Sequence, residues 1–434
     1  MERKCKIFKK GNKQSGITLV ALVVTVVVLL ILAGVSIRLV LDNNGIITRA
    51  GDAKDKHEQG RANDQTDLNS AEDYINQMTG GGSGGGTDGG SGTGSLPTGT
   101  GTTPYYPGSD FTQVGGTDLS NGLVIQDGSE NQYVWIEVPK TADVYPTAGT
   151  AITEFTDDKY TAIETDLHTY TNVYRNGTSY KDEYNSDETT GLTNEAYSAL
   201  KKRMLKSVYQ NGGFWIGRYE AGIGTNRTSH SEIADDLVPI SKANQYPLTY
   251  VYCSEAQTLA SRVLPSGGTY TSSLMFGVQW DLVLKYLETK GTVQADLKTD
   301  STSWGNYCDA SFTINRGKYA KNGALSSDWN EYNTSLENCV KYENGISTKL
   351  SASSSSNGII LTTGSSDTCK KQNIYDLAGN VLEWTLEYTS DSSSPCAKRG
   401  GGYNLSGSFY PASYRHSGIT TYSSDNFGAR VSLY

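Results

Sequence analysis

A run of 21 residues without any charge follows a basic N-terminus and constrains this chain more than any other feature. The run extends from Ile17 to Ile37, and as a helix it would span about 31 Å, the thickness of the hydrocarbon core of a bilayer. Residues 1–16 carry six basic side chains and one acidic one, so the N-terminus should stay in the cytoplasm. The sequence therefore predicts a transmembrane helix over residues 17–37, a cell-membrane location and an extracellular C-terminal part.

The rest of the sequence divides into three stretches of different composition. Residues 38–79 are polar with scattered apolar side chains, and we expect a helical stalk that continues the membrane helix. Residues 80–103 have glycine at half of the positions and Ser or Thr at most others, which predicts a flexible linker. Residues 104–434 are then long enough to form one large folded domain.

Charge and composition argue against several functional classes. The chain has 37 Lys and Arg against 46 Asp and Glu, and a net charge of −9 does not suit a protein that binds nucleic acid. Its four histidines are far apart in the sequence, which leaves little for a multi-histidine metal site. The 48 glycines and 29 tyrosines favour an exported, loop-rich protein that contains β-structure.

Periodicity predicts helices and strands in residues 104–434. Helices are expected at 194–208, at 254–263 with Ser254 as the cap, and at 278–288. Strands are expected at 133–138, 214–219 and 429–433, whereas the fold of residues 140–195 stays open. Together with the irregular loops between them, these elements predict the α+β fold class.

The N-terminal arrangement resembles the leader of type IV pilins and pseudopilins. The small residue Gly16 comes directly before the apolar run, whereas a secretory signal peptide has its small residues after the run. In that family a prepilin peptidase cleaves after the glycine and methylates the new N-terminus, so the resemblance implies processing between Gly16 and Ile17. It also implies other pilin subunits as partners, although Ala21 stands where the family has a glutamate that docks subunits. A plain signal anchor is the alternative.

Three C-terminal segments resemble the formylglycine-generating-enzyme-like, or sulfatase-modifying-factor, family, a branch of the C-type-lectin-like fold. They read NIYDLAGNVLEW at 373–384, RGGGY at 399–403 and FGARV at 427–431, in the order in which the family has them. The segment GGFWIGRYEAG at 212–222 resembles the opening strand of the family. The resemblance covers about residues 133–434 and implies that residues 104–434 adopt this fold.

The resemblance does not extend to the activity of the enzyme. The enzyme uses two cysteines a few residues beyond the RGG segment to bind copper and activate oxygen, and Leu405 and Tyr410 stand at the matching positions. Neither side chain can act as a thiolate ligand, so we predict that the chain is not an enzyme. Sequence alone leaves the disulfide pairing open among the five cysteines beyond the apolar run: Cys253, Cys308, Cys339, Cys369 and Cys396.

The resemblance also implies a calcium site. In the family, the D-x-x-G-N-x-x-E segment surrounds a calcium ion, which here assigns the carboxylates of Asp376 and Glu383 and the carbonyls of Gly379 and Val381. The alternative is that the two carboxylates cap turns or pair with arginines. Other residues are expected to be structural: Trp215, Trp280 and Trp384 as core aromatics, Arg430 as the partner of an internal carboxylate, and Glu220 and Glu387 as a solvated face or salt-bridge partners.

The last 35 residues have a composition suited to an adaptable binding surface. Residues 400–434 contain no Lys, Glu, Gln, Met or Trp, and are dominated by Tyr, Ser, Asn, Gly and Phe. Mutation of the adenines of A-A-pyrimidine codons produces none of the five missing residues, and diversity-generating retroelements mutate adenines in this way. The chain resembles their variable proteins, whose variable segment lies at the C-terminus of a domain of this kind. Chance absence of the five residue types is the alternative.

The predicted function is that of a surface-displayed adhesin or receptor that binds an unknown external protein or glycan. The scaffold residues expected to stay fixed are Gly400, Gly401, Gly428, Arg430 and Val431. The expected ligand contacts are Tyr403, Asn404, Ser406, Ser408, Phe409, Tyr410, Ser413, Tyr414, His416, Tyr422, Ser423 and Asn426. The alternatives are a structural minor pilin or pseudopilin of a filament and, with less support, an exported enzyme.

Overall fold

The computed structural model describes residues 95–265, 267–321, 329–331 and 358–434. The chain divides into two compact units, residues 1–83 and 84–434, and every described residue belongs to the second unit. The predicted leader, membrane helix and stalk, residues 1–79, lie outside the described residues.

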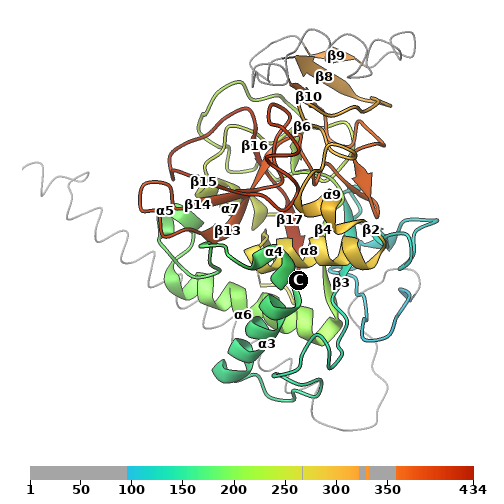
Figure 1. Cartoon of the computed structure of the whole chain (residues 1–434), viewed down its shortest axis with the longest axis vertical. Coiled ribbons are helices and arrows are strands. Elements are labelled where there is room, and N and C mark those ends of the chain that lie inside the picture. The colour runs from blue at the N-terminus through green and yellow to red at the C-terminus, as the bar shows by residue number, and fades with distance from the viewer. Residues whose placement is uncertain (1–94, 266, 322–328, 332–357) are drawn as a thin grey trace, which may run out of the picture. The chain divides into compact units, whose positions relative to one another are not determined.

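Two sheets carry most of the described fold (Figure 1). The larger one is antiparallel throughout and has six strands, in the order β1 (Thr112–Gln113), β2 (Val124–Gln126), β3 (Gln132–Glu137), β4 (Gly213–Gly217), β17 (Val431–Leu433) and β7 (Ser272–Leu274). The second sheet has the order β15 (Arg415–Gly418), β14 (Cys396–Arg399), β13 (Leu382–Tyr388) and β16 (Phe427–Ala429), in which β13 and β16 are parallel.

Three smaller sheets join loops around these two. One consists of β10 (Ile359–Leu361), β8 (Lys318–Lys321) and β9 (Asn330–Glu331). The other two are the pairs β11 (Lys370–Lys371) with β12 (Ile374–Tyr375), and β5 (Gly222–Ile223) with β6 (Tyr246–Pro247). Strands this short have no measurable alternation of polar and apolar residues, so periodicity could not predict them.

All three predicted helices are present, and further helices accompany them. The predicted ones are α6 (Asn194–Asn211), α7 (Cys253–Ala260) and α8 (Gly277–Thr289). The additional ones are α3 (Asp157–Tyr170), α4 (Asn172–Arg175), α5 (Asp187–Thr190) and α9 (Gln294–Lys298). Helix α7 starts before Ser254, and its first turn is closed by Glu255, whose carboxylate accepts from the N–H of Tyr252 at 2.8 Å. Helix α3 escaped prediction because Ile163 and Leu167 are its only fully buried apolar side chains.

The predicted strands at 133–138 and 214–219 correspond to β3 and β4. The predicted strand at 429–433 is instead two strands, β16 and β17, which belong to different sheets and are separated by Arg430. The buried guanidinium of Arg430 donates to Glu383 on β13, to the carbonyl of Gly217 at the end of β4 and to that of Tyr375 on β12. One side chain therefore joins the two main sheets at the point where the chain passes between them.

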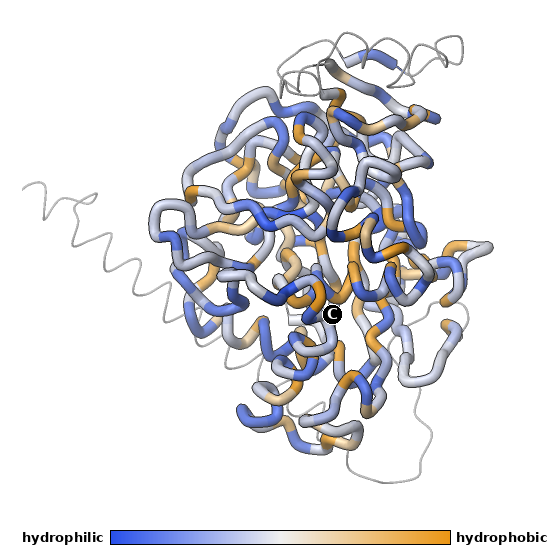
Figure 2. Tube along the Cα trace, viewed as in Figure 1, coloured by the Kyte–Doolittle hydropathy of each residue, from blue (hydrophilic) through white to orange (hydrophobic). Residues whose placement is uncertain are grey.

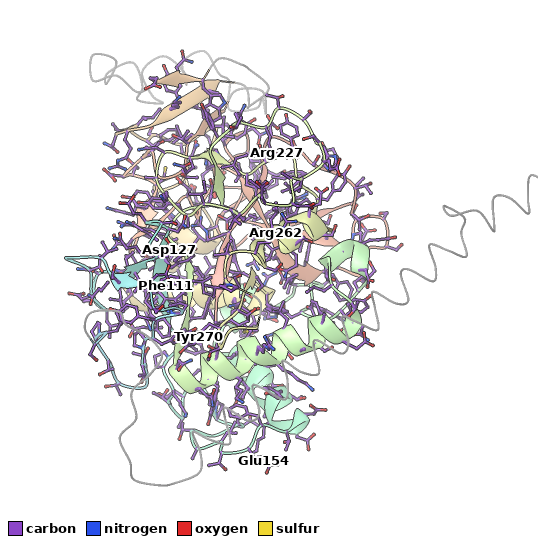
Figure 3. The ribbon with its side chains drawn as sticks, turned by 180° about the vertical axis from the view of Figure 1, so that it is seen from behind. Phe111, Asp127, Glu154, Arg227, Arg262 and Tyr270 are labelled. Carbon is purple, nitrogen blue, oxygen red and sulfur yellow. A yellow bond between two sulfur atoms is a disulfide. The ribbon has the colours of Figure 1, made fainter. Side chains whose placement is uncertain are left out.

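Aromatic side chains fill much of the core, as predicted for Trp215, Trp280 and Trp384, each at most 1 % exposed. The rings of Trp135 and Trp215 lie 5.0 Å apart on neighbouring strands, and Tyr105 stacks at 4.3 Å on Tyr270, which is labelled in Figure 3. Figure 2 shows hydrophobic residues concentrated along the inner strands and hydrophilic ones along many of the loops.

The last residues of the predicted linker are packed against this core. Thr102 is buried, donates to the carbonyl of Gly212 at 3.0 Å and accepts from the indole N–H of Trp135 at 2.9 Å. Gly101 has a φ of 75°, and a Cβ there would lie 2.6 Å from the backbone nitrogen of Lys140. The glycine here permits close packing, which composition alone could not distinguish from a flexible chain.

The predicted fold class was wrong. It combined an α+β domain with a membrane-spanning helix, whereas the described residues form mostly β-sheets with a few helices. Among the helices in the described part of the chain, none has both the length and the apolar character needed to cross a membrane. Residues 17–37, for which that helix was predicted, lie outside the described residues.

Candidate functional site

The segment 403–426 runs from β14 to β16, with β15 in its middle, and supplies the predicted contact residues. Three of them are exposed: Phe409 at 76 %, Tyr422 at 51 %, and Ser408. Tyr403 and Asn426 are buried. The others are half-buried, namely Asn404, Ser406, Tyr410, Ser413, Tyr414, His416 and Ser423. The prediction therefore named a continuous segment whose members have different surroundings.

Three rings of this segment form a cluster, which we call the aromatic cluster: Tyr410, Tyr414 and His416. The rings of Tyr410 and Tyr414 meet edge to face at 4.7 Å, and the ring of His416 lies 6.1 Å from Tyr414 and 6.5 Å from Tyr410. Burial lowers the pKa of His416, and the neighbouring Lys398 lowers it further. The cluster thus consists of half-buried rings, and the exposed Phe409 directly precedes Tyr410 in the sequence.

The side chain of Arg415 anchors strand β15 to the interior of the protein. Because successive side chains of a strand point to opposite faces, Arg415 is directed inward while its neighbours belong to the aromatic cluster. Its guanidinium lies 2.8 Å from Asp281 and 2.8 Å from Glu387, and it donates to the carbonyl of Tyr174 at 2.8 Å. The contact rings are therefore attached to a fixed strand.

Arg415 belongs to a buried ion network of six residues: Arg175, Arg399, Arg415, Asp182, Asp281 and Glu387. Arg399 is completely buried and bonds to Asp281 at 2.8 Å and to Glu387 at 3.1 Å. Burial alone would raise the pKa of Asp281, but the three guanidinium groups hold it below its ordinary value. Of the two alternatives for Glu387, the structure confirms the salt-bridge partner and not the solvated face.

Several buried and half-buried contact candidates tie the loops of the segment together. The hydroxyl of Tyr403 donates to Asp425 at 2.6 Å, and the amide of Asn426 donates to Asn404 at 3.0 Å. Ser413 has a similar role through its backbone, whose N–H donates to the carbonyl of Leu297 at 3.0 Å. These residues are placed to shape the loops from within.

Lys398 lies beneath the same surface, and no pattern in the sequence indicates it. It stands opposite His416 in the register of β14 and β15, and its Nζ lies 3.7 Å from the ring centre of Phe427. Its Nζ donates to the carbonyl of Ser417 at 3.2 Å, and no carboxylate pairs with it among the described residues. Burial lowers its pKa to about 7.

The residues predicted to bind calcium form a buried acidic region. Both carboxylate oxygens of Glu383 accept from Arg430, at 2.6–3.1 Å, as expected if Glu383 pairs with an arginine. Asp376 accepts from the N–H of Gly364 at 2.7 Å, and its other oxygen is buried without a hydrogen-bond partner. Burial raises the pKa of Asp376 to about 7. Asp376 is therefore the one carboxylate of the predicted set that has an uncommitted oxygen.

A further buried carboxylate, Glu220, faces the same segment. It accepts from the side-chain amide of Asn380 at 2.7 Å and from the N–H of Val381 at 3.1 Å. Burial, followed by the charges of Asp376 and Glu383, raises its pKa well above the usual range. Gly379 turns the chain here with a φ of 78°, and a Cβ would lie 2.1 Å from the carbonyl oxygen of Asn306. The segment around Gly379 is thus fixed by Glu220 on one side and by the backbone of Asn306 on the other.

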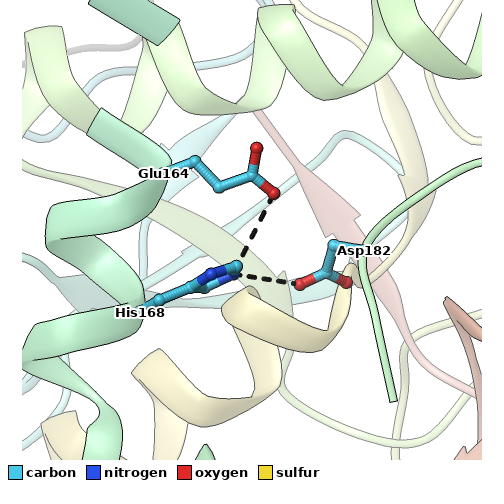
Figure 4. Close-up of side chains that lie close together, drawn as sticks. All are labelled: Glu164, His168 and Asp182. Atoms are coloured by element: carbon cyan, nitrogen blue, oxygen red, sulfur yellow. Dashed lines mark ion pairs between the residues drawn. The ribbon is translucent and has the colours of Figure 1, made fainter. Parts of the chain in front are cut away.

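In the described residues, one group of side chains brings three candidate metal ligands together: Glu164, His168 and Asp182 (Figure 4). His168 Nε2 lies 3.5 Å from Asp182 and 4.0 Å from Glu164. Lys201 already bonds to both oxygens of Glu164, and Arg175 bonds to Asp182 at 2.9 Å. Both carboxylates of this group therefore already have a cationic partner from the protein.

The cysteines form one disulfide in the described residues, between Cys253 at the start of α7 and Cys396 at the start of β14. Cys308 and Cys369 are buried, and Cys339 lies outside the described residues. Leu405 and Tyr410 stand at the positions that match in sequence the two copper-binding cysteines of the formylglycine-generating enzyme. Tyr410 belongs to the aromatic cluster, and the carbonyl of Leu405 accepts from the N–H of Cys308 at 2.9 Å.

No protein-family model matches the chain, and no curated protein matches its sequence.

Proposed function

We propose that this chain is an exported binding protein that recognises an external protein or glycan through the surface of residues 403–426. The observation that carries the proposal is the alternation at the start of β15, where Tyr414 and His416 stand on either side of an Arg415 that is anchored in the buried ion network. Rigid aromatic rings on a fixed backbone give contact area at a low cost in conformational entropy.

Export is supported by the disulfide between Cys253 and Cys396. Such bonds persist in oxidising surroundings and are rare where thiols are kept reduced. Cleavage by a prepilin peptidase after Gly16 is part of the same proposal. It predicts that the mature chain begins with a methylated Ile17, which N-terminal analysis of the protein from its own host can test.

The binding surface can be tested by differential capture. The full chain and a variant with Phe409→Ala, Tyr414→Ala and Tyr422→Ala would be coupled to beads and exposed to glycan arrays and cell-surface extracts. Val293→Ala is the matched control, because Val293 is 63 % exposed but lies outside the segment. We expect ligands that bind the parent and the control to lose at least about tenfold in affinity for the triple variant. Equal capture by all three proteins would contradict the proposal.

The resemblance to variable proteins of diversity-generating retroelements leads to a separate test. The DNA beside the gene should contain a near-copy of the last 35 codons, with adenines where the gene has other bases, next to a reverse-transcriptase gene. If that copy is missing, the surface is a fixed binding site or belongs to a minor pilin.

A further inference from the structure

The turn after helix α4 contains an asparagine followed by a glycine, and both residues are exposed. Gly177 has a φ of 80°, and nothing lies within 4 Å of the place that a Cβ would occupy. In the described part of the chain, no hydrogen bond involves the side-chain amide of Asn176 or the backbone N–H of Gly177. The amide carbon and the nitrogen of the next residue are therefore both free to approach each other.

Two other Asn-Gly pairs in the described residues are held in place. The side chain of Asn121 accepts from Asp118 and donates to the carbonyl of Gly116, and a Cβ on Gly122 would lie 2.1 Å from the carbonyl oxygen of Gln372. The amide of Asn211 donates to Ser207 at 3.2 Å. The three Asn-Gly dipeptides therefore have the same sequence, but only at Asn176 is the side-chain amide without a hydrogen bond among the described residues.

We propose that Asn176 is a site of spontaneous deamidation. The backbone nitrogen of Gly177 gives up its proton to solvent and forms a bond to the side-chain amide carbon of Asn176. The carbon–nitrogen bond of the side-chain amide breaks, and ammonia leaves. Water then opens the five-membered imide at either of its two carbonyl carbons, which yields aspartate or isoaspartate at position 176. The reaction consumes one water molecule and involves no oxidant or reductant.

The glycine and the exposed turn favour this reaction for physical reasons. Glycine carries no side chain that would shield its nitrogen, and it rotates more freely than any other residue. Exposed loop tips are also the regions in which the backbone departs most easily from its average conformation. The proposal depends only on this turn and not on the proposed binding function.

The product changes the surroundings of the buried ion network. The new carboxylate would be next to Arg175, which bonds to Asp182 and Asp281 at 2.9 Å each. The isoaspartate form would also add one backbone atom to the chain that leads to Asp182. Deamidation therefore modifies the chain beside the network that anchors β15.

Mass spectrometry of the intact chain tests the proposal. The protein would be incubated in mildly alkaline buffer prepared with heavy-oxygen water, digested, and compared with an unincubated sample. We expect heavy oxygen in the peptide that contains Asn176, in two products separable by chromatography, with the Asn121 and Asn211 peptides unchanged. The variant Asn176→Gln should show no product, since its longer side chain does not form the five-membered ring. Gly177→Ala should slow the reaction.

Two results would overturn the proposal. One is an intact amide at Asn176 after incubation, or conversion no faster than at Asn121 and Asn211. The other is a glycan on the side-chain nitrogen of Asn176, which is followed by Gly177 and Thr178 in the order of a glycosylation acceptor. The variant Asn176→Asp serves as the chromatographic standard for the aspartate product.

Discussion

The guanidinium of Arg415 lies 2.8 Å from the carboxylate of Asp281, so a residue of the surface segment is bonded to helix α8 in the core. Asp281 accepts from Arg175, Arg399 and Arg415, which come from α4, β14 and β15. This contact explains how a segment of irregular loops can hold aromatic side chains at fixed positions.

Replacement of Arg415 should destabilise the protein strongly. Arg415→Ala leaves Asp281 and Glu387 with fewer buried partners, and we expect a loss of about 3–5 kcal/mol in the free energy of unfolding. Lys202→Ala is the control, because its pair with Asp157 is exposed and should contribute at most about 1 kcal/mol. Denaturant unfolding measures both. Similar losses for the two variants would show that the buried ion network does not hold β15.

Asp376 should make the protein less stable as the pH rises from about 4 to about 7. In this range the folded carboxyl, whose pKa is raised to about 7, keeps a proton that the unfolded chain has released. Its stabilising contribution is complete below the unfolded pKa and is lost as the pH passes the folded one. Asp376→Asn should remove up to about 1.4 kcal/mol per pH unit from this slope, measured by denaturant unfolding. An unchanged slope in the variant would show that the pKa of Asp376 is not raised in the folded protein.

Lys398 should have the opposite effect at higher pH. Between about 7 and about 10.4 the unfolded chain holds a proton that the folded amine has lost, so stability should rise with pH. Lys398→Met should abolish the rise and stabilise the protein at and below neutral pH. Lys202→Met, at a half-exposed lysine, is the matched control and should leave the profile as it is.

The disulfide should contribute substantially to stability. It closes a loop of 143 residues and joins α7 to the strand that pairs with β15. We expect the double variant Cys253→Ser/Cys396→Ser to lose about 2–5 kcal/mol. A reducing agent should lower the melting temperature of the parent toward that of the variant and leave the variant unchanged. A parent insensitive to reduction would indicate that the bond does not form.

Calcium is expected to have little effect on stability. Glu383 is already bonded to Arg430, and a cation at the predicted residues would have to displace that arginine or bind beside it. Melting temperatures in calcium and in a chelator should therefore agree. A clear rise in calcium that disappears in Asp376→Asn would instead establish the metal site that the family resemblance implies.

Sequence reasoning succeeded where a local pattern decides the structure. The amphipathic spacing of residues 194–208 located α6, and the large apolar rings of Trp215, Trp280 and Trp384 had no stable place except the core. It failed for α3, whose buried face is narrow, and for the packed end of the glycine-rich tract.

The candidate site was predictable as a segment and not as a surface. Composition indicated residues 400–434, but which side chains are exposed depends on partners far away in the sequence. Tyr403 is buried because it meets Asp425, and Arg415 is directed inward because Asp281 and Glu387 receive it. Lys398 could not be identified, because a buried lysine has no sequence signature that separates it from a surface one.

The position of β17 in the larger sheet has a consequence for biosynthesis. This strand lies between β4 and β7, yet its residues 431–433 come far after those of β4 in the sequence. The sheet therefore stays divided until residues 431–433 have been synthesised, since β4 pairs with them on one side. A nascent chain that lacks β17 therefore cannot join the two parts of the larger sheet, however long its earlier strands have been available.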